Sequence, residues 1–304
     1  MLAMNKITPI TAPSTVKIIH STYGEIVFLD ESKNPSGTHK DRMAQTITTI
    51  YQDMLKSNHT LRLSLISSGS AAYAIQLALT ERQLPPLKVL IDESRKEIEI
   101  LKKIGCEIYT FDLESKLLSS NDILKLTDNK EGIEVTSNMA IKPYENYYKE
   151  LVSYLSHFDS GYIFVPYGTG HLYGSFLFCD IFNEPYNVHI IGGKTHFRYS
   201  KADKLYAPFN PFSMVNNNFI KTKIAMNKVG KHSSISEFTE TSLNDAIILA
   251  ENNKLNLEPS ALGGLAIMID MFNHHSLKYN NKKLVVVTGK SKIYSELNQL
   301  TKIA

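Results

Sequence analysis

The chain has 304 residues, enough to bury a substantial core in one large or two medium domains. Its 43% hydrophobic and 21% charged residues are typical of a soluble globular protein, and a net charge of +3 spread along the chain argues against a nucleic-acid partner. Residues 1–13 lack the apolar segment of a signal peptide, and no run approaches the ~18–20 apolar residues of a membrane-spanning helix, so we expect no membrane partner.

The chain contains two cysteines, Cys106 and Cys179, and each lies among apolar residues. So few cysteines are typical of a protein from a reducing compartment rather than of one stabilised by disulfides. We therefore expect both to be buried, unreactive thiols and the protein to be cytoplasmic.

The first predicted elements are two short strands, 16–20 and 25–29, which form a hairpin around Ser-Thr-Tyr-Gly. The turn-forming sequence NPSG follows, and Thr38 is the expected N-cap of a helix that begins at Lys40. A lysine that is fixed on the first turn of a helix and shielded from water can have a lowered pKa and attack an aldehyde. The alternative for Lys40 is an ordinary solvated lysine.

Strands then alternate with helices, which predicts βαβ units and a parallel sheet. We assign residues 45–142 to a smaller, mobile α/β domain, in which residues 113–142 are a polar connection without clear periodicity. The predicted strands are 61–66, 88–91 and 107–111, and the predicted helices are 71–81 and 94–103.

A second α/β series follows, and residues 1–44 together with 143–304 are assigned to a larger domain that binds the cofactor. Residues 194–234 are rich in Asn, Lys and Phe, and we expect loops and short helices that either cover a site or form a surface excursion. The predicted helices are 143–155, 175–182, 243–252, 261–272 and 293–300, and the predicted strands are 162–166, 188–192 and 284–287.

Two groups of small residues follow predicted strands, where parallel sheets carry their functional loops. In residues 67–71, SSGSA, hydroxyl and N–H groups at a helix start suit a substrate carboxylate, and a serine-rich N-cap is the alternative. In residues 168–172, GTGHL, converging N–H groups and the helix dipole suit an anion. The alternative there is a tight turn that needs glycine for steric reasons alone.

Four motifs occur in order along the chain: NPSGTHKDR at 34–42, SSGSA at 67–71, GTGHL at 168–172, and EPS at 258–260 followed by Thr288-Gly289. Together they resemble the motifs of the pyridoxal-phosphate enzymes of the tryptophan synthase β-subunit type. This fold type II group contains threonine synthase, threonine dehydratase and cysteine synthase. The resemblance covers nearly the whole chain and implies an α/β fold of two three-layer parallel-sheet domains, with the cofactor in the cleft between them.

The resemblance also implies a role for each motif. Lys40 forms the Schiff base with pyridoxal 5'-phosphate and then removes the substrate α-proton. Thr288 or Ser260 meets the pyridine nitrogen, and Glu258-Pro259 favours Thr288, as in threonine synthase. We expect no metal site. The other cofactor-binding residues are His39, Ser70, Gly168, Thr169, Gly170, His171 and Leu172, and the substrate-binding residues are Ser67, Ser68, Gly69 and Ala71.

Two positions depart from the family pattern. Ser70 stands where relatives usually carry Asn against the cofactor's ring hydroxyl, and its shorter side chain leaves a gap there. His171 stands where glycine is usual, so the phosphate cradle is tighter or gains an imidazole donor. These departures motivate an alternative of another class, a catalytically weak relative that acts as a binding or regulatory protein. Retention of Lys40 argues against that alternative.

The implied reaction is β- or γ-elimination or replacement on a small amino acid, namely serine, threonine or an O-activated derivative. A neutral hydroxyl leaves the ring nitrogen unprotonated, which favours elimination and replacement over transamination. Threonine synthase and threonine dehydratase are the nearest relatives, and a cysteine synthase-like β-replacement is the alternative. Relatives are commonly homodimers, so we expect a homodimer with a small amino-acid substrate.

Overall fold

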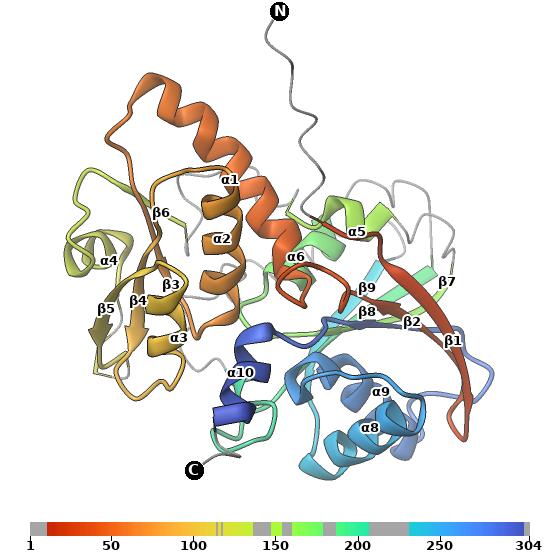
Figure 1. Ribbon diagram of the computed structural model, residues 1–304. Helices are drawn as coiled ribbons and strands as arrows, with labels where there is room; N and C mark the ends of the chain where they lie inside the picture. Colours follow the sequence, from red (N-terminus) through yellow and green to blue (C-terminus); the bar gives the residue numbers. More distant parts are fainter. Residues whose placement is uncertain are drawn as a thin grey trace, which may run out of the picture.

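A computed structural model of the chain describes residues 11–113, 115, 116, 118–135, 147–153, 160–178, 187–206 and 231–300. Within these residues the strands form a six-stranded sheet and a four-stranded sheet (Figure 1). Apart from one antiparallel hairpin, all neighbouring strands are parallel. The predicted α/β class with parallel sheets is confirmed.

The larger sheet consists of β1 (Thr15–Ser21), β2 (Gly24–Asp30), β7 (Ser160–Pro166), β8 (Asn187–Lys194), β9 (Lys231–Glu237) and β10 (Lys283–Val287). The strand order is β1-β2-β10-β7-β8-β9, and β1 with β2 form the predicted hairpin. In β10, Leu284 and Val286 point into one apolar core, whereas Val285 and Val287 point into another. This alternation buries both faces of the sheet.

Helices cover the larger sheet on both faces, as Figure 1 shows. One pair, α8 (Glu240–Asn252) and α9 (Gly263–Asn273), packs in the core that contains Val285 and Val287. The other pair, α5 (Lys149–Ser153) and α6 (His171–Phe178), contributes to the core on the opposite face. The larger sheet is therefore the middle of three layers.

The smaller sheet consists of β3 (Leu63–Ile66), β4 (Lys88–Asp92), β5 (Glu107–Phe111) and β6 (Ile133–Glu134) in the order β5-β4-β3-β6. Val89 and Ile91 of β4 face the core that contains α2 (Ser70–Glu81) and α3 (Ile98–Lys103). Leu90 packs with Ile123 of α4 (Ser120–Leu126) on the opposite face. The same alternation thus makes a second set of three layers.

Helix α1 (Lys40–Ser57) ties the two sheets together. Its buried Met43 and Ile47 lie in one continuous apolar core with Leu65 of the smaller sheet and Val165 of the larger sheet. The start of α1 is thereby fixed next to both sheets.

The strands of the smaller sheet all fall within residues 45–142, and those of the larger sheet fall within 1–44 and 143–304. The division into two domains at these boundaries, and the mobility of the smaller one, stay predictions.

Three elements lie in the two stretches for which the sequence predicted a connection without clear periodicity (113–142) or loops and short helices (194–234). Helix α4 begins at a capping box in which Ser119 Oγ accepts from the Asp122 N–H and the Asp122 carboxylate accepts from the Ser119 N–H. Short β6 pairs with β3 in the same stretch. Strand β9 has the polar sequence KHSSISE and forms by pairing with β8 at the sheet edge, which no apolar pattern signals.

Several helix starts differ from the prediction. Helix α3 begins at Ile98 rather than 94, and α6 begins at His171 rather than 175. Thr38 is not the N-cap of α1, because His39 holds that position without a side-chain cap, although Thr38 Oγ1 accepts from the Lys40 N–H at 3.2 Å. The short helix η5 (Pro259–Leu262) precedes α9, and α10 (Lys292–Leu300) ends the described chain. The predicted helices 143–155 and 175–182 lie partly outside the described residues.

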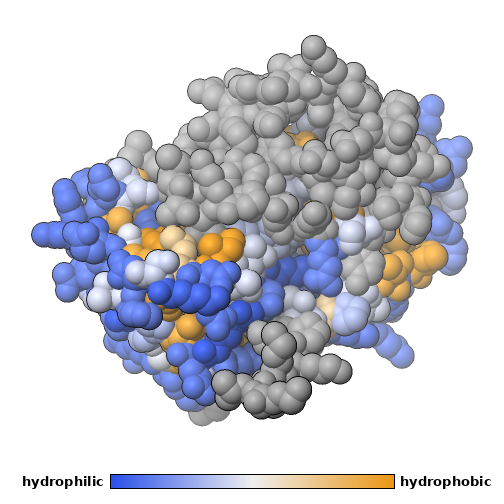
Figure 2. Space-filling view, turned by 90° about the horizontal axis from the view of Figure 1, so that it is seen from above, coloured by the Kyte–Doolittle hydropathy of each residue, from blue (hydrophilic) through white to orange (hydrophobic). Residues whose placement is uncertain are grey.

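Hydrophilic residues predominate on the described surface in Figure 2, where apolar residues form only small patches. Among the described helices, none is both long enough and apolar enough to cross a membrane. Cys106 is buried, as predicted, and burial raises the pKa of its thiol to about 12, which disfavours the reactive thiolate. Cys179 lies outside the described residues.

Candidate active site

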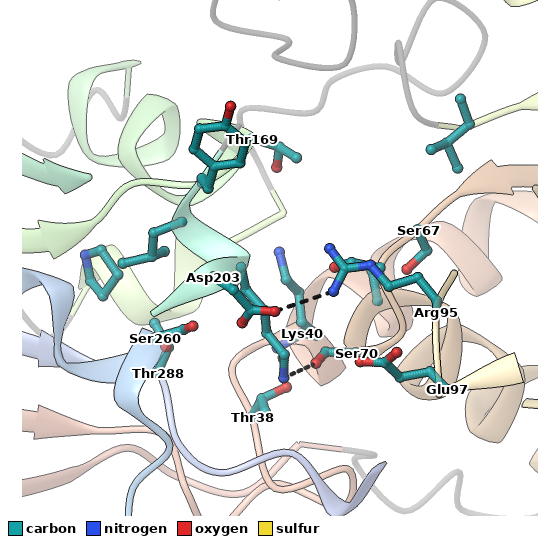
Figure 3. Close-up of a pocket in the computed structure, with 18 of the residues that line it drawn as sticks. Thr38, Lys40, Ser67, Ser70, Arg95, Glu97, Thr169, Asp203, Ser260 and Thr288 are labelled. Atoms are coloured by element: carbon teal, nitrogen blue, oxygen red, sulfur yellow. Dashed lines mark hydrogen bonds and ion pairs between the residues drawn. The ribbon is translucent and has the colours of Figure 1, made fainter. Parts of the chain in front are cut away.

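A cavity of about 610 Å³ lies at the carboxyl ends of β3, β4, β7 and β10 (Figure 3). This is the edge where parallel sheets place their functional loops. Among the predicted site residues, only Gly69 does not line it. Those that do are Thr288, Ser260, His39, Lys40, Ser67, Ser68, Ser70, Ala71, Gly168, Thr169, Gly170, His171 and Leu172.

Lys40 is the first residue of α1 and is held there by the turn before it. Gly37 has φ +84°, and a Cβ at this position would lie 2.2 Å from the Lys290 carbonyl oxygen, so the turn requires glycine. The Lys290 N–H donates to the Gly37 carbonyl at 2.9 Å, and this bond locks the turn against the end of β10. The start of α1 is therefore placed by contacts to the larger sheet.

The environment of Lys40 lowers the pKa of its amine from 10.5 to about 8. Burial is the main cause, the Glu258 carboxylate opposes it, and the Lys204 ammonium adds to it. With a pKa of about 8, roughly a tenth of the side chain is a neutral amine at pH 7. A neutral amine is the form that attacks an aldehyde.

The loop at 168–172 joins β7 to the start of α6. Gly168 packs so closely that a Cβ would lie 3.1 Å from the Lys204 carbonyl oxygen, and Gly170 has φ +91°. The imidazole of His171 bonds through Nδ1 to Thr169 Oγ1 at 2.8 Å and stacks on Tyr147. Burial, helped by the charge of Lys40, lowers the pKa of His171 to about 3, so its ring is neutral. The loop therefore offers glycine backbone, a hydroxyl and a neutral imidazole to an anion.

His39 is buried beside Lys40, and its backbone N–H donates to the Thr288 carbonyl oxygen at 3.2 Å. Burial and the charge of Lys40 lower the pKa of His39 well below its ordinary value. Within the described part of the chain its Nδ1 has no hydrogen-bond partner. A buried polar atom without a partner at a cavity wall suits a bound polar group.

The loop that starts α2 is organised around Ser67. Its Oγ accepts from the Gly69 N–H at 3.0 Å and from the Ala72 N–H at 3.3 Å. Gly69 has φ +127°, and a Cβ there would lie 3.0 Å from Glu97 Cγ. Gly69 thus shapes the loop rather than the cavity wall.

The two candidates for the pyridine nitrogen, Thr288 and Ser260, are both buried and both line the cavity. Neither hydroxyl has a hydrogen-bond partner among the described side chains and backbone. The geometry therefore leaves both available, and the preference for Thr288 stays a prediction.

The main residue that sequence reasoning missed is Lys204, in the short helix η3 (Asp203–Leu205). Its Nζ lies 2.9 Å from Glu258 Oε2 and 3.2 Å from Ser70 Oγ. The adjacent Asp203 pairs with Arg95 at 3.2 Å, and Figure 3 shows these two side chains pointing toward one another. Within the described part of residues 194–234, residues 198, 199 and 203–206 line the cavity, which favours the first of the two alternatives.

These groups fit pyridoxal 5'-phosphate. Lys40 suits its aldehyde, the loop at 168–172 suits its phosphate, and the free hydroxyls of Thr288 and Ser260 suit its ring nitrogen. No cluster of three or more His, Cys, Asp or Glu side chains that could hold a metal ion occurs in the residues described.

No protein-family model matches the sequence, and no curated protein is similar to it in sequence. Solved structures are similar in fold. The O-acetylserine-dependent cystathionine β-synthase from Helicobacter pylori has a TM-score of 0.71 at 13% identity, over 94% of this chain and 95% of that one. The processed form of threonine deaminase isoform 2 from Solanum lycopersicum has a TM-score of 0.67 at 17% identity, over 97% and 89%.

A pyridoxal 5'-phosphate-dependent aspartate racemase has a TM-score of 0.64 at 13% identity, over 91% of this chain and 90% of that one. These likenesses extend over nearly the whole chain and confirm the predicted fold, that of the tryptophan synthase β-subunit-like enzymes.

Proposed function

We propose that the protein binds pyridoxal 5'-phosphate on Lys40 and catalyses β- or γ-elimination or replacement on a small amino acid such as serine, threonine or an O-activated derivative. One observation carries the proposal: an amine with a pKa of about 8 lines the same cavity as the glycine-rich loop at 168–172 and the hydroxyls of Thr288 and Ser260, which have no hydrogen-bond partner among the described residues. The fold, shared with enzymes named for such chemistry, supports it.

The protein's own residues then have defined tasks. Lys40 holds the cofactor's aldehyde carbon, and as a free amine it takes the proton from the substrate α-carbon. The loop at 168–172 holds the phosphate, with His171 as a neutral member of the loop, and the loop at 67–71 holds the substrate carboxylate. When bound, the cofactor supplies an electron-withdrawing ring that stabilises negative charge on the substrate.

A neutral hydroxyl from Thr288 at the ring nitrogen favours elimination and replacement. Threonine synthase- or dehydratase-like chemistry is our first choice, and cysteine synthase-like replacement is the second. We also propose a homodimer and closure of the smaller sheet over the larger one. The alternative of another class is a weakly active protein that keeps the fold for binding or regulation.

The test is an assay of the cofactor-loaded protein with L-serine, L-threonine and O-acetyl-L-serine, with and without sulfide. We expect the wild-type protein to release ammonia and a keto acid, or to form a thiol amino acid. The Lys40→Ala variant should give neither product. Chiral analysis of the remaining amino acid separates these reactions from racemisation. A protein that holds the cofactor but neither consumes nor spectrally responds to any of these amino acids would support the binding alternative instead.

A further inference from the structure

Lys204 reaches from the larger-sheet side of the cavity to the smaller-sheet side. Its backbone packs on Gly168 of the loop at 168–172, where the absence of a side chain leaves room for the Lys204 carbonyl oxygen. The next residue, Leu205, is buried and packs against Gly263. The main chain at Lys204 is therefore anchored, and its side chain extends from a fixed base.

The ammonium of Lys204 is held close to the start of α2. Its side chain is only 14% exposed, and the Glu258 carboxylate accepts one of its protons at 2.9 Å. A second proton points to Ser70 Oγ at 3.2 Å. A lysine ammonium has three N–H donors, so it can serve Glu258 and still bind another acceptor.

Ser70 is the first residue of α2, so the N–H groups of Ser70 and Ala71 belong to the first turn, where helices lack internal acceptors. Ser68 and Ala71, the neighbours of Ser70 in this loop, also line the cavity. A cation, backbone N–H donors and a hydroxyl at one place are the groups that bind a carboxylate.

Besides Glu258, a second acidic group opposes this arrangement. Glu97 is 7% exposed, lies against Gly69, and points toward Ser70 in Figure 3. Burial raises the pKa of Glu97, while Lys204 and Arg95 act to lower it. The ammonium of Lys204 therefore offsets the negative charge of Glu97 in the wall that receives the substrate.

We propose that Lys204 is a substrate-binding residue that recognises the α-carboxylate of the amino acid by a direct ammonium–carboxylate hydrogen bond, with the carboxylate taking the place of Ser70 Oγ. This inference rests on the proposed function. It adds a charged partner to the loop at 67–71 and gives residues 203–205 a role in binding.

The experiment compares amino acids with their carboxamides, which lack the negative charge. The dissociation constants of L-serine, L-threonine, L-serinamide and L-threoninamide are measured from spectral changes of the cofactor-loaded protein. In wild type we expect the acids to bind more tightly than the amides. In Lys204→Met we expect acid binding to weaken by about 10- to 100-fold with little change for the amides, the range for a hydrogen bond to a charged group.

Three variants separate recognition from other effects. Lys204→Arg keeps a cation and should keep part of the preference for acids over amides. Lys96→Met removes an exposed lysine that also lines the cavity and should keep that preference in full. Arg95→Gln breaks the ion pair with Asp203 but leaves the Lys204 side chain in place. If Lys204 mattered only because residues 203–205 must be held in position, Arg95→Gln would lose the preference for acids over amides as Lys204→Met does.

Equal weakening of acids and amides in Lys204→Met, or loss of the preference in Arg95→Gln, would overturn the inference and leave the proposed function standing. No spectral response of wild type to any of the four compounds would overturn the inference, and the proposed function would fall with it only if O-acetyl-L-serine also gave no response. Borohydride labelling of Lys40 in each variant shows whether the site has kept its fold.

Discussion

Lys40 and Lys204 place two amines in one cavity, with Glu258 as the acid that acts on both. The Lys204 ammonium lowers the pKa of Lys40 and the Glu258 carboxylate raises it, on top of the larger effect of burial. Because Glu258 binds Lys204 directly, its charge is shared between the two amines. The reactivity of Lys40 is thus set by residues far from it in the sequence.

These opposed charges predict opposite shifts in the pKa of Lys40. Lys204→Met removes a neighbouring cation, so the pKa should rise above about 8, and Glu258→Gln removes an anion, so it should fall below about 8. The pH dependence of Lys40 acetylation in the cofactor-free protein, read by peptide mapping, gives each midpoint. Lys96→Met is the control and should not move it. Shifts of the same sign in both variants would contradict this electrostatic assignment.

A second residue-scale prediction separates Thr288 from Ser260. Thr288→Val keeps the shape and the backbone carbonyl that accepts from His39, and it removes only the hydroxyl. We expect Thr288→Val to weaken cofactor binding about three- to tenfold, the effect of one hydrogen bond, and Ser260→Ala to change it little. Equilibrium dialysis measures both constants. The reverse order would move the protein toward the cysteine synthase-like alternative.

At the scale of elements, the turn at 34–38 positions the start of α1 by meeting residues 288–292. Besides the bond to Gly37, the Lys292 N–H donates to the Ser36 carbonyl and the His39 N–H donates to the Thr288 carbonyl. Lys40 therefore depends on backbone contacts between segments from the two ends of the chain.

This contact predicts that Gly37→Ala and Gly105→Ala lower the free energy of unfolding by different amounts. Gly105 and Gly37 both have positive φ, so alanine at either should cost about 1–3 kcal/mol in backbone strain. Only at Gly37 does the new Cβ also meet a backbone oxygen at 2.2 Å, whereas at Gly105 the nearest atom is a side-chain nitrogen at 3.5 Å. Urea unfolding should therefore show a clearly larger loss for Gly37→Ala. Equal losses would show that the turn can shift.

Most elements were predictable because their side chains alternate or recur with a regular period. Strand β10 has four consecutive buried Leu and Val residues, and the hairpin β1–β2 flanks a short turn. Strand β9 was not predictable in this way, because it is polar and forms through backbone pairing with β8 at the edge of the sheet. Helix α4 begins at the capping box of Ser119 and Asp122, a pair of side-chain hydrogen bonds that apolar periodicity does not reveal.

The candidate site was largely predictable because its motifs are short and local. Lys204 was not, because its partners lie 134 residues away at Ser70 and 54 residues away at Glu258. Contacts of that kind depend on the tertiary fold and leave no local pattern. Ser70 was expected to leave a gap, and in the structure the Lys204 ammonium lies beside its hydroxyl.

For the whole molecule, the cavity lies where two sheets joined through α1 meet. Two side-chain contacts link the smaller-sheet side of the cavity to residues 203–205, namely Arg95 to Asp203 and Ser70 to Lys204. These links fit a smaller domain that closes on the larger one. That motion and the homodimer stay proposals.

Burying Lys40 has a cost for the stability of the whole protein, and its pH dependence has a definite sign. The pKa of Lys40 falls from 10.5 to about 8 on folding, so the unfolded chain binds more protons between these values and stability from this group rises with pH in that window. Below pH 8 the amine is charged in both states and the full cost remains.

Lys40→Met should therefore stabilise the cofactor-free protein most below pH 8, and its advantage should shrink as the pH rises toward 10.5. Urea unfolding at a series of pH values measures this difference, with Lys96→Met as the exposed-lysine control. An advantage that stays constant or grows with pH would contradict the depressed pKa.

The central claim is that Lys40 is the amine that binds the cofactor. Borohydride reduction of the protein after incubation with pyridoxal 5'-phosphate, followed by peptide mapping, tests it most directly. We predict that the pyridoxyl group is found on Lys40 and is lost in Lys40→Ala while the fold is kept. Label on Lys204, a partly buried lysine that lines the same cavity, or on surface lysines alone would contradict the account.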